Sequence, residues 1–268
     1  MHKKIIKFIL ISIIIWIIII FIISFISSKD TSKNIDANSF QTTEKIKEEL
    51  DNKTILNIKE NTPEKVVVKK IVQPFVCPKP KKEYDDMLLF NIGQNTGLPD
   101  TTYTPKNLKE LGLDLSIRKE ICLTKETMDA FKLMSEAAKK DKITIKISSG
   151  FRSYEKQKSL YEADLKKTGE DDSDSVANPG YSEHQLGTTI DITGLSINYA
   201  SAVDNFNETV EDYWLRDNAY LYGFVQSYPE DKVDVTHYIY EPWHYRYIGI
   251  DDAKQIKDSG LTITEFLK

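Results

Sequence analysis

Apolar and polar positions divide the 268-residue chain into three parts with different patterns. Residues 8–26 are almost wholly Ile, Phe, Leu and Trp, and a helix of this length, at about 1.5 Å per residue, crosses a hydrocarbon core of about 30 Å. Residues 29–82 are rich in Lys, Glu, Asn and Thr without a sustained period, which is typical of a flexible spacer. We therefore predict a cytoplasmic stub with a transmembrane anchor (1–28), an extracytoplasmic spacer (29–82) and a folded domain (83–268).

The charges beside the apolar run indicate its orientation. Lys3, Lys4 and Lys7 precede the run, so the positive-inside rule places the N-terminus in the cytoplasm and the rest of the chain outside. A cleavable secretory signal would have a shorter apolar core and a small-residue cleavage site, and residues 24–28 offer only a poor one. We expect a single-pass type II anchor in the cell membrane.

The first half of the folded domain predicts a helix, a strand and a second helix. Apolar residues recur at helical spacing after Thr124, a residue type that favours the N-cap position. Residues 143–147 alternate as a half-buried strand should, and helical spacing returns at residues 154–165 and ends near Gly169. The apolar positions of the first helix are Met128, Phe131, Met134 and Ala138.

The second half mixes short strands and helices. Strand-like runs occupy residues 188–192, 238–240 and 244–248, and helical patterns occupy residues 210–217 and 251–259, the latter closed by Gly260. Because the elements do not follow a regular strand–helix–strand alternation, we expect an α+β fold with an antiparallel sheet flanked by helices.

Composition narrows the function classes. A hydrophobic content of 40% and a charged content of 29% are ordinary for a globular protein. The 36 basic and 41 acidic residues give a net charge of -5, which argues against a protein that binds nucleic acid by neutralising phosphates. We expect no nucleic-acid partner.

Two cysteines, Cys77 and Cys122, lie in the part predicted to be exported. A disulfide is chemically feasible in that compartment, and closing this loop would stabilise the fold by about 4 kcal/mol in the chain-entropy model. Two unpaired thiols fit the sequence equally well, because the sequence does not show how far apart the cysteines lie.

Two histidines lie in polar segments with acids close by. A catalytic zinc site needs three protein ligands and one open position, and His184, Asp191 and His244 supply such a set. Gly187 gives backbone freedom between the first two, and Pro242 interrupts strand alternation before the third. The segments read Ser182-Glu183-His184-Gln185-Leu186-Gly187-Thr188-Thr189-Ile190-Asp191 and Glu241-Pro242-Trp243-His244.

Glu241 then remains as an acid outside the ligand set. A carboxylate beside a zinc site can take the proton of a water molecule and later deliver it to a leaving amine. The spacing of Glu241 to His244 therefore favours a role as general base over that of a solvent-facing acid.

The two segments resemble the Ser-x-His-x-x-Gly-x-x-x-Asp and Glu-x-Trp-His signatures of the VanY-like D-alanyl-D-alanine carboxypeptidases, a family of zinc peptidases that shares its fold with Hedgehog-type domains. The resemblance runs from about Cys122 to the C-terminus. It includes two further runs, Ser149-Gly150-Phe151-Arg152-Ser153-Tyr154 and Trp243-His244-Tyr245-Arg246-Tyr247.

This resemblance implies roles for particular residues. It implies a general base at Glu241 and a cation, Arg152, over the scissile carbonyl or the terminal carboxylate of the substrate. Gln157 and Ser182 resemble positions that help to hold the substrate end. One Zn²⁺ per chain would be bound by His184, Asp191 and His244.

The sequence also departs from the family pattern. Thr189 stands where the family usually has alanine, and His237 where glycine is common. We assign no chemistry to His237 or to Trp243, which fits a core position. The acidic run at residues 170–174 lacks the ligand–glycine pattern of a calcium loop, so we interpret it as a solvated loop.

The resemblance implies a membrane-anchored zinc carboxypeptidase that removes the C-terminal D-alanine from peptidoglycan stem peptides. The sequence leaves open an L,D-carboxypeptidase that acts on tetrapeptides, because that preference depends on the shape of the pocket. An endopeptidase that cuts cross-links and a non-catalytic wall-binding module on the same fold also remain, since fold alone does not establish activity.

Overall fold

The computed structural model describes residues 74–173, 175–202 and 204–268. No helix in these ranges is long and apolar enough to cross a membrane. The predicted anchor at residues 8–26 lies outside the described residues.

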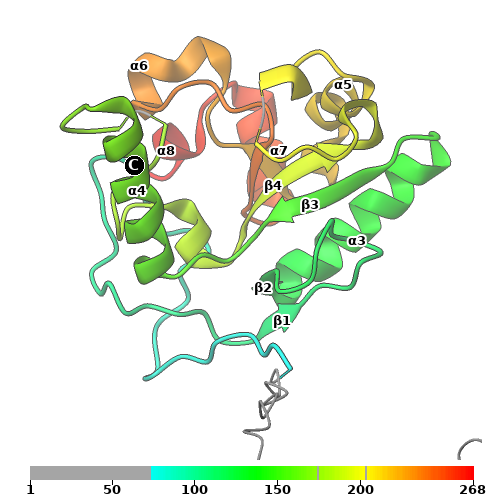
Figure 1. Ribbon diagram of the computed structural model, residues 1–268. Coiled ribbons are helices and arrows are strands. Elements are labelled where there is room, and N and C mark those ends of the chain that lie inside the picture. The colour runs from blue at the N-terminus through cyan, green and yellow to red at the C-terminus, as the bar shows by residue number, and fades with distance from the viewer. Residues whose placement is uncertain (1–73, 174, 203) are drawn as a thin grey trace, which may run out of the picture. The chain divides into compact units, whose positions relative to one another are not determined.

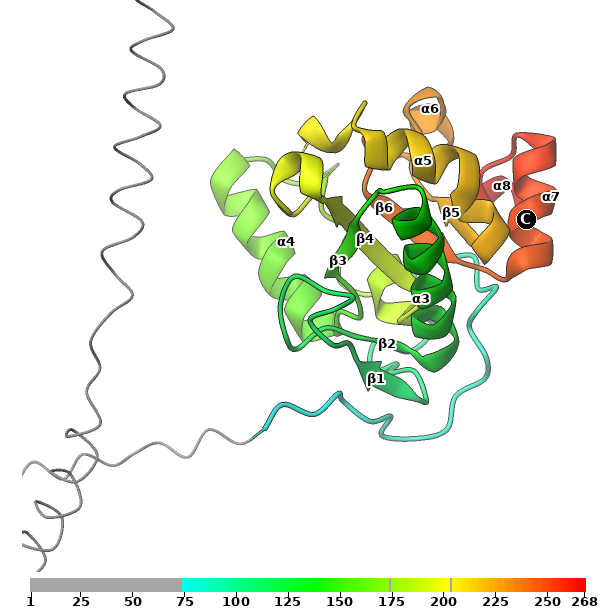
Figure 2. The same ribbon diagram turned by 90° about the vertical axis from the view of Figure 1, so that its right-hand side faces the viewer.

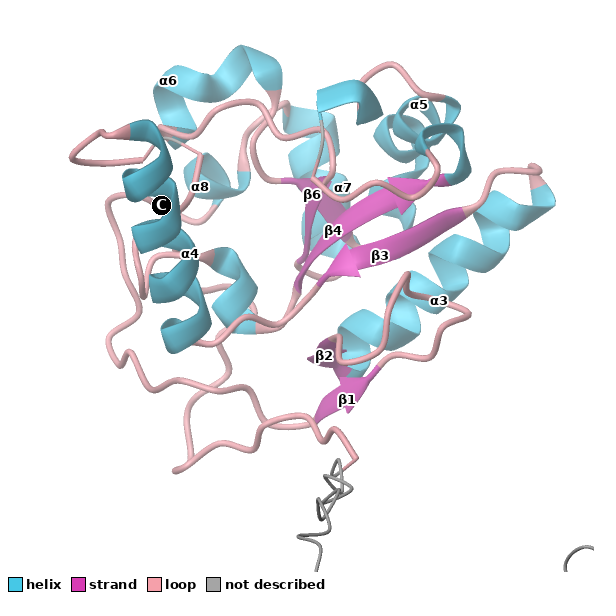
Figure 3. Ribbon diagram, in the orientation of Figure 1, coloured by secondary structure: helices cyan, strands magenta, loops and turns pink. Residues whose placement is uncertain are grey.

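The described part of the chain is built around a four-stranded sheet in the order β3-β4-β6-β5, in which every neighbouring pair is antiparallel. A separate antiparallel hairpin is formed by β1 and β2. Figure 3 shows helices and loops around this small sheet, so the α+β class with antiparallel pairing is confirmed. The strands are β1 (Leu108–Glu110), β2 (Cys122–Thr124), β3 (Ile145–Ser149), β4 (Thr189–Gly194), β5 (Phe224–Gln226) and β6 (His244–Tyr247).

The helices lie on both sides of the sheet, and Figure 2 shows β3 and β4 between α3 and α4. The C-terminal helices α7 and α8 form a smaller cluster of their own around Ile256 and Ile263. The helices are α3 (Lys125–Lys140), α4 (Tyr154–Thr168), α5 (Val210–Asn218), α6 (Val233–Thr236), α7 (Ile250–Ser259) and α8 (Ile263–Phe266).

The two predicted helices of the first half are present, the first beginning after Thr124 and the second ending at Gly169 as predicted. The side chain of Thr124 accepts a hydrogen bond from the backbone N–H of Thr127 and so caps α3. Phe131 and Met134 on the apolar face of α3 are fully buried in the main core, and Met128 is partly buried against it. Helix α4 ends at Gly169, which adopts a left-handed conformation with φ 77°.

Alternation along β4 gives the sheet two different faces. Ile190 and Ile192 pack into the main core, whereas Asp191 between them points to the opposite face. On β6, Tyr245 is likewise in the main core, and His244 lies on the face that carries Asp191. One face of the sheet therefore holds the core and the other holds candidate chemistry.

One predicted strand is wrong. Residues 238–240 form a loop, although Tyr238 is buried and Ile239 is exposed as strand alternation would require. Strand β6 is paired on both sides, with β4 and with β5, whose Phe224 lies opposite Tyr247. Strand β5 has only three residues, too few to show a period in the sequence.

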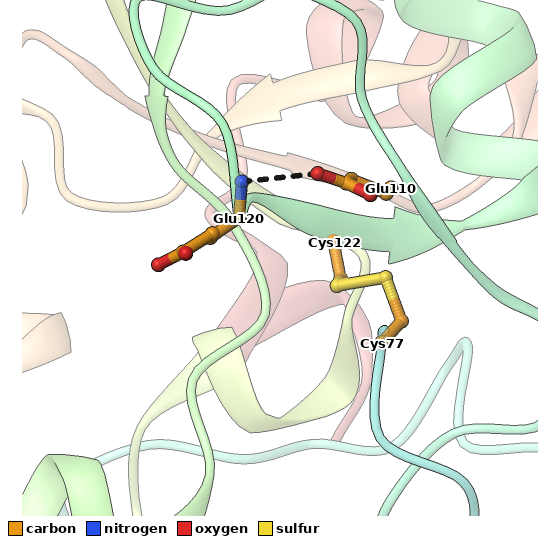
Figure 4. Close-up of a disulfide and its surroundings, with 4 residues drawn as sticks. All are labelled: Cys77, Glu110, Glu120 and Cys122. Carbon is orange, nitrogen blue, oxygen red and sulfur yellow. Dashed lines mark hydrogen bonds between the residues drawn. A yellow bond between two sulfur atoms is a disulfide. The ribbon is translucent and has the colours of Figure 1, made fainter. Parts of the chain in front are cut away.

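A disulfide joins Cys77 to Cys122 on β2, with a Cα–Cα distance of 5.9 Å and a sequence separation of 45 (Figure 4). This finding decides between the two alternatives that the sequence leaves open. It also ties residues 74–82, which we place in the spacer on sequence alone, covalently to the β1–β2 hairpin.

We expect the double substitution Cys77→Ser, Cys122→Ser to lower the free energy of unfolding by about 2–4 kcal/mol, because the opened chain gains conformational entropy when it unfolds. Urea unfolding monitored by tryptophan fluorescence measures this change. The wild-type protein under reducing conditions is the matched comparison and should show a similar loss. A loss below about 1 kcal/mol in both would contradict the stabilising role of the bridge.

Candidate active site

The three predicted ligand residues come together on one face of the sheet. Asp191 on β4 lies directly opposite His244 on β6, and His184 lies on the single 3₁₀ turn Glu183–Leu186 that leads into β4. One side-chain atom from each of the three lies within 4.8 Å of the others, and all three residues are buried. Figure 1 shows β4 next to β3, and Figure 3 shows β6 on the other side of β4.

The turn that carries His184 depends on a glycine. Gly187 ends the turn with φ 71°, and a Cβ there would lie 2.9 Å from the Cγ of Pro105. The carbonyl of His184 also accepts a hydrogen bond from the backbone N–H of Arg152, at 3.2 Å. These contacts fix the backbone on which the imidazole stands.

Each imidazole uses one nitrogen for orientation and leaves the other facing the same carboxylate. Nδ1 of His184 lies 2.8 Å from the carbonyl oxygen of Gly150, and Nε2 of His244 lies 3.0 Å from Oε2 of Glu183. The remaining nitrogens, Nε2 of His184 and Nδ1 of His244, are each 3.4 Å from Oδ1 of Asp191. This arrangement is typical of metal-binding histidines, whose second nitrogen is held by an acceptor.

These atoms fit a zinc ion. Oδ1 of Asp191 is buried and has no hydrogen-bond partner within the described part of the chain. Tetrahedral Zn²⁺ with bonds of about 2.0–2.1 Å separates its ligand atoms by roughly 3.3 Å, close to the two distances of 3.4 Å found here. An orphaned carboxylate oxygen at these separations from two imidazole nitrogens is therefore suited to hold such a cation.

Electrostatics favours a cation as well. Burial and the positive charge of Arg152 lower the pKa of His184, which keeps this imidazole neutral and able to bind a metal. Burial opposes the charge on Asp191, but the neighbouring imidazoles of His184 and His244 outweigh it and hold the pKa of this carboxyl well below its usual range. Asp191 is therefore ionised at neutral pH.

Glu241 lies beside this cluster without belonging to it. Its Oε2 is 3.1 Å from Nδ1 of His244, and its side chain lines the same pocket. Burial raises the pKa of the Glu241 carboxyl, and the hydrogen bond with His244 partly offsets this effect. A raised pKa brings the group closer to the range in which it can both accept and return a proton.

Arg152 points toward the cluster from the loop between β3 and α4. Its Nη2 is 3.9 Å from Oδ2 of Asp191 and donates a hydrogen bond to Oγ of Ser149 at 3.3 Å. Its Nη1 donates to Oε1 of Gln157 at 2.8 Å, and Gln157 in turn donates to the carbonyl of Ala177 at 2.6 Å. Gln157 therefore holds the guanidinium group in place, in addition to lining the pocket.

Ser182 is buried and also lines the pocket. Its side chain makes no capping hydrogen bond to the turn that follows it.

The pocket over the cluster has a volume of about 630 Å³. It contains all three candidate ligands together with Glu241 and Arg152, and Leu160 of α4 and Val176 form apolar parts of its wall. Trp243 packs in the main core as predicted and also reaches the wall of the pocket. A pocket of this size holds several amino-acid residues of a substrate.

The two departures from the family pattern have different physical consequences. Thr189 is fully buried, and its Oγ1 lacks a hydrogen-bond partner in the described ranges. His237 is exposed and adopts φ 60° at the end of α6, a conformation that favours glycine. Neither residue belongs to the ligand cluster.

Three polar residues behind His244 were not predicted. Glu183 is buried, and its Oε2 accepts a hydrogen bond from Oγ of Ser227 at 2.6 Å as well as from His244. Its Oε1 accepts from Nη1 of Arg246 at 3.1 Å. Burial opposes the charge on Glu183, but these partners outweigh it and lower the pKa to about 2.

A signal for this group exists in the sequence. His244 and Arg246 are two residues apart in one strand, so their side chains share a face. A buried arginine on the face of the ligands needs an acidic partner, and Glu183 is the acid adjacent to His184.

Two buried imidazoles and a carboxylate beside a free carboxylate, at the base of a pocket on an antiparallel sheet, define a metallopeptidase site. A family model described as VanY, D-alanyl-D-alanine carboxypeptidase, matches residues 120–250. The Bacillus subtilis protein YodJ, which is named as a carboxypeptidase, is 38% identical over 185 residues, covering 68% of this chain and 67% of that protein. The chain belongs to the VanY D-alanyl-D-alanine carboxypeptidase family.

Solved structures agree with this assignment. The structure of the LdcB LD-carboxypeptidase has 38% sequence identity and a TM-score of 0.61, covering 65% of this chain and 83% of that one. A mutant of the vancomycin resistance D,D-pentapeptidase VanY in complex with Zn(II) has 29% identity and a TM-score of 0.56, covering 67% of this chain and 98% of that one. The match spans 50% and 44% of the lengths of two enterococcal D-alanyl-D-alanine carboxypeptidases.

Proposed function

We propose that this protein is a zinc-dependent D,D-carboxypeptidase that releases the C-terminal D-alanine from peptidoglycan stem peptides. One Zn²⁺ per chain would be held by His184, Asp191 and His244. The observation that carries the proposal is the pair of imidazole nitrogens, each 3.4 Å from one buried carboxylate oxygen that has no other described partner. Membership of the D-alanyl-D-alanine carboxypeptidase family supports the choice of the C-terminal D-Ala-D-Ala peptide bond as the bond that is cut.

When bound, Zn²⁺ supplies a Lewis acid that polarises the scissile carbonyl and makes a water molecule easier to deprotonate. Glu241 takes a proton from this water molecule as the water oxygen adds to the carbonyl carbon. The C–N bond then breaks, and Glu241 returns the proton to the departing amine, leaving a shortened peptide carboxylate and free D-alanine. The burial that raises the pKa of Glu241 suits it to both transfers.

Arg152 would bind the carboxylate at the end of the substrate. Its guanidinium group is held by Gln157 and Ser149 and faces the pocket, so little conformational freedom is lost when a carboxylate pairs with it. A fixed cation at this point requires a free C-terminus, which favours a carboxypeptidase over an endopeptidase. Ser182, in the wall of the same pocket, would help to hold the substrate end.

An L,D-carboxypeptidase acting on tetrapeptides is the second candidate. The likeness to the LdcB LD-carboxypeptidase favours it, since the identity of 38% exceeds the 29% found with the D,D-pentapeptidase. Both activities use the same metal, base and cation. They differ in the configuration of the residue before the scissile bond.

We expect the full chain in detergent to release D-alanine from a synthetic pentapeptide that ends in D-Ala-D-Ala, and a chelator to stop the release until Zn²⁺ is restored. Glu241→Ala should lower kcat by about 10²–10⁴-fold while zinc binding persists, because the proton acceptor is lost and the ligands are not. Mass analysis of the products measures the release, and Glu136→Ala, an exposed acid on α3, is the control.

Cleavage of the matching tetrapeptide alone would establish the L,D activity in place of the D,D activity. Cleavage only within cross-linked peptides would establish an endopeptidase. Failure to cleave any of these substrates with zinc bound would contradict the enzymatic proposal and favour a wall-binding module.

For Arg152→Gln we expect kcat/KM on the pentapeptide to fall roughly 10–100-fold, because a hydrogen bond to a charged group is worth about 1.5–3 kcal/mol. The same peptide with an amidated C-terminus should be a poor substrate of the wild type and should be little affected by the substitution. Parallel kinetics on the two peptides make the comparison, and the exposed Arg118→Gln is the matched control. An equal loss on both peptides would assign Arg152 to the scissile carbonyl.

We also propose that residues 8–26 anchor the protein in the cell membrane, with the domain outside and residues 29–82 as spacer. The apolar length of this run and the three lysines before it support the proposal. We expect the full chain to remain in the membrane fraction after an alkaline wash and its domain to be accessible to added protease in spheroplasts. A chain without residues 1–28 should not sediment with membranes. Recovery of a soluble product cut near residues 24–28 would contradict a retained anchor.

A further inference from the structure

We propose that Glu183 is a positioning residue that sets which nitrogen of His244 faces the metal. This inference rests on the proposed zinc site and adds a residue to it that is not a ligand. Glu183 is 3% exposed and lies directly before His184 in the chain, yet its carboxylate is directed at the other histidine.

The carboxylate of Glu183 is fully engaged on the side away from the pocket. Its Oε2 lies 2.6 Å from Oγ of Ser227 and 3.0 Å from Nε2 of His244, and its Oε1 lies 3.1 Å from Nη1 of Arg246. An ionised carboxylate only accepts hydrogen bonds. Nε2 of His244 must therefore carry a hydrogen. When the ring binds a metal with only one hydrogen left, Nδ1 is then the nitrogen that presents the lone pair.

The opposite side of the ring would favour the wrong tautomer. Nδ1 of His244 has two carboxylate oxygens close by, from Glu241 at 3.1 Å and from Asp191 at 3.4 Å. Without an acceptor at Nε2, a neutral ring would carry its single hydrogen on Nδ1, between these two acids. The lone pair that the metal needs would then be on Nε2, on the side of the ring away from the metal site. Glu183 offsets this preference.

Glu183 is itself linked, through Arg246, to the backbone of residues 88–90, which precede α3 in the chain. Nη2 of Arg246 donates to the carbonyl oxygens of Leu88 and Phe90, both at 2.8 Å, and Arg246 is fully buried. A continuous series of hydrogen bonds therefore runs from the backbone at residues 88–90 through Arg246 and Glu183 to His244.

The two histidines differ in this respect. His184 is oriented by a backbone carbonyl, that of Gly150, which no side-chain substitution removes. The orientation of His244 depends on a side chain. Loss of Glu183 should therefore weaken the metal site through one ligand and leave the other in place.

The test is the zinc affinity of the full chain in detergent, measured by competition with a chromophoric chelator. We expect Glu183→Ala to bind Zn²⁺ about 10–100-fold more weakly than the wild type. Glu183→Gln keeps an oxygen acceptor for Nε2 and should bind more tightly than Glu183→Ala. The matched control is Glu211→Ala, which removes another buried carboxylate, one that accepts from the backbone of Ser196 and lies outside the zinc cluster.

A spectroscopic readout separates positioning from general damage. In ¹H–¹⁵N spectra of the zinc-loaded wild type, the Nε2–H of His244 should exchange slowly with water, because Glu183 holds it in a buried hydrogen bond. The signal should be lost in Glu183→Ala and kept in Glu211→Ala.

Glu183→Ala leaves Arg246 buried without its acid, which could prevent folding. The double variant Glu183→Met, Arg246→Met removes both charges together, and it should fold and show the same 10–100-fold loss of zinc affinity. Zinc affinity within twofold of the wild type in a folded Glu183→Ala or in the double variant would overturn the inference, as would equal affinities for the Ala and Gln variants. Absence of zinc binding by the wild type would instead contradict the proposed function and this inference together.

Discussion

The site depends on the register between two central strands. Because β4 and β6 pair antiparallel with Asp191 opposite His244, an oxygen and a nitrogen that are 53 positions apart in sequence meet on one face of the sheet. A shift of one residue would turn one of the two side chains into the apolar core. The isoleucines at 190 and 192 make that shift costly, since they would leave the core in exchange. The hydrophobic pattern that folds the sheet therefore also places the ligands.

The polar face opposite the core gathers five charged groups, of which Glu183, Asp191 and Arg246 are buried and Glu241 and Arg152 are half-buried. Glu183, Asp191 and Glu241 provide three carboxyl groups, and Arg152 and Arg246 provide two guanidinium groups. Buried charges are costly unless each has partners, and here almost every one has. Two buried atoms of this group have no hydrogen-bond partner within the described residues. They are Nε of Arg246 and Oδ1 of Asp191, and the latter lies 3.4 Å from each of the two free imidazole nitrogens. A divalent cation would complete this set of charges, so metal binding and the stability of this face are expected to be linked.

Sequence reasoning succeeded where local chemistry decides the structure. The cap at Thr124, the apolar stripe of α3 and the end of α4 at Gly169 follow from nearby residues alone. It failed at residues 238–240, where a real alternation of burial exists without strand pairing. Whether such a run joins a sheet depends on pairing with distant strands, which the local pattern does not encode.

The same distinction applies to the site. The ligand set could be proposed because His184, Asp191 and His244 stand in two short sequence motifs that are specific to the family. For Glu183 the sequence offers only a partial signal, an acid next to His184, because its partners, His244 and Arg246, lie more than 60 positions away. Glu183 is adjacent to His184 in the chain, but its hydrogen bond is to His244. This contact forms only when β4 and β6 pair in the folded protein.

Gly150 joins two parts of the molecule that look separate in the sequence. Its carbonyl holds the imidazole of His184, and a Cβ on it would lie 2.7 Å from the carbonyl oxygen of Cys122, the residue that ends the disulfide. The backbone N–H of the next residue, Phe151, donates to that same oxygen at 2.8 Å. The disulfide-linked hairpin and the candidate metal ligand His184 therefore both contact the backbone at residues 150–151, where there is no space for a side chain on Gly150. We expect the redox state of the two cysteines to influence how firmly that imidazole is held, so that formation of the disulfide would also complete the proposed metal site.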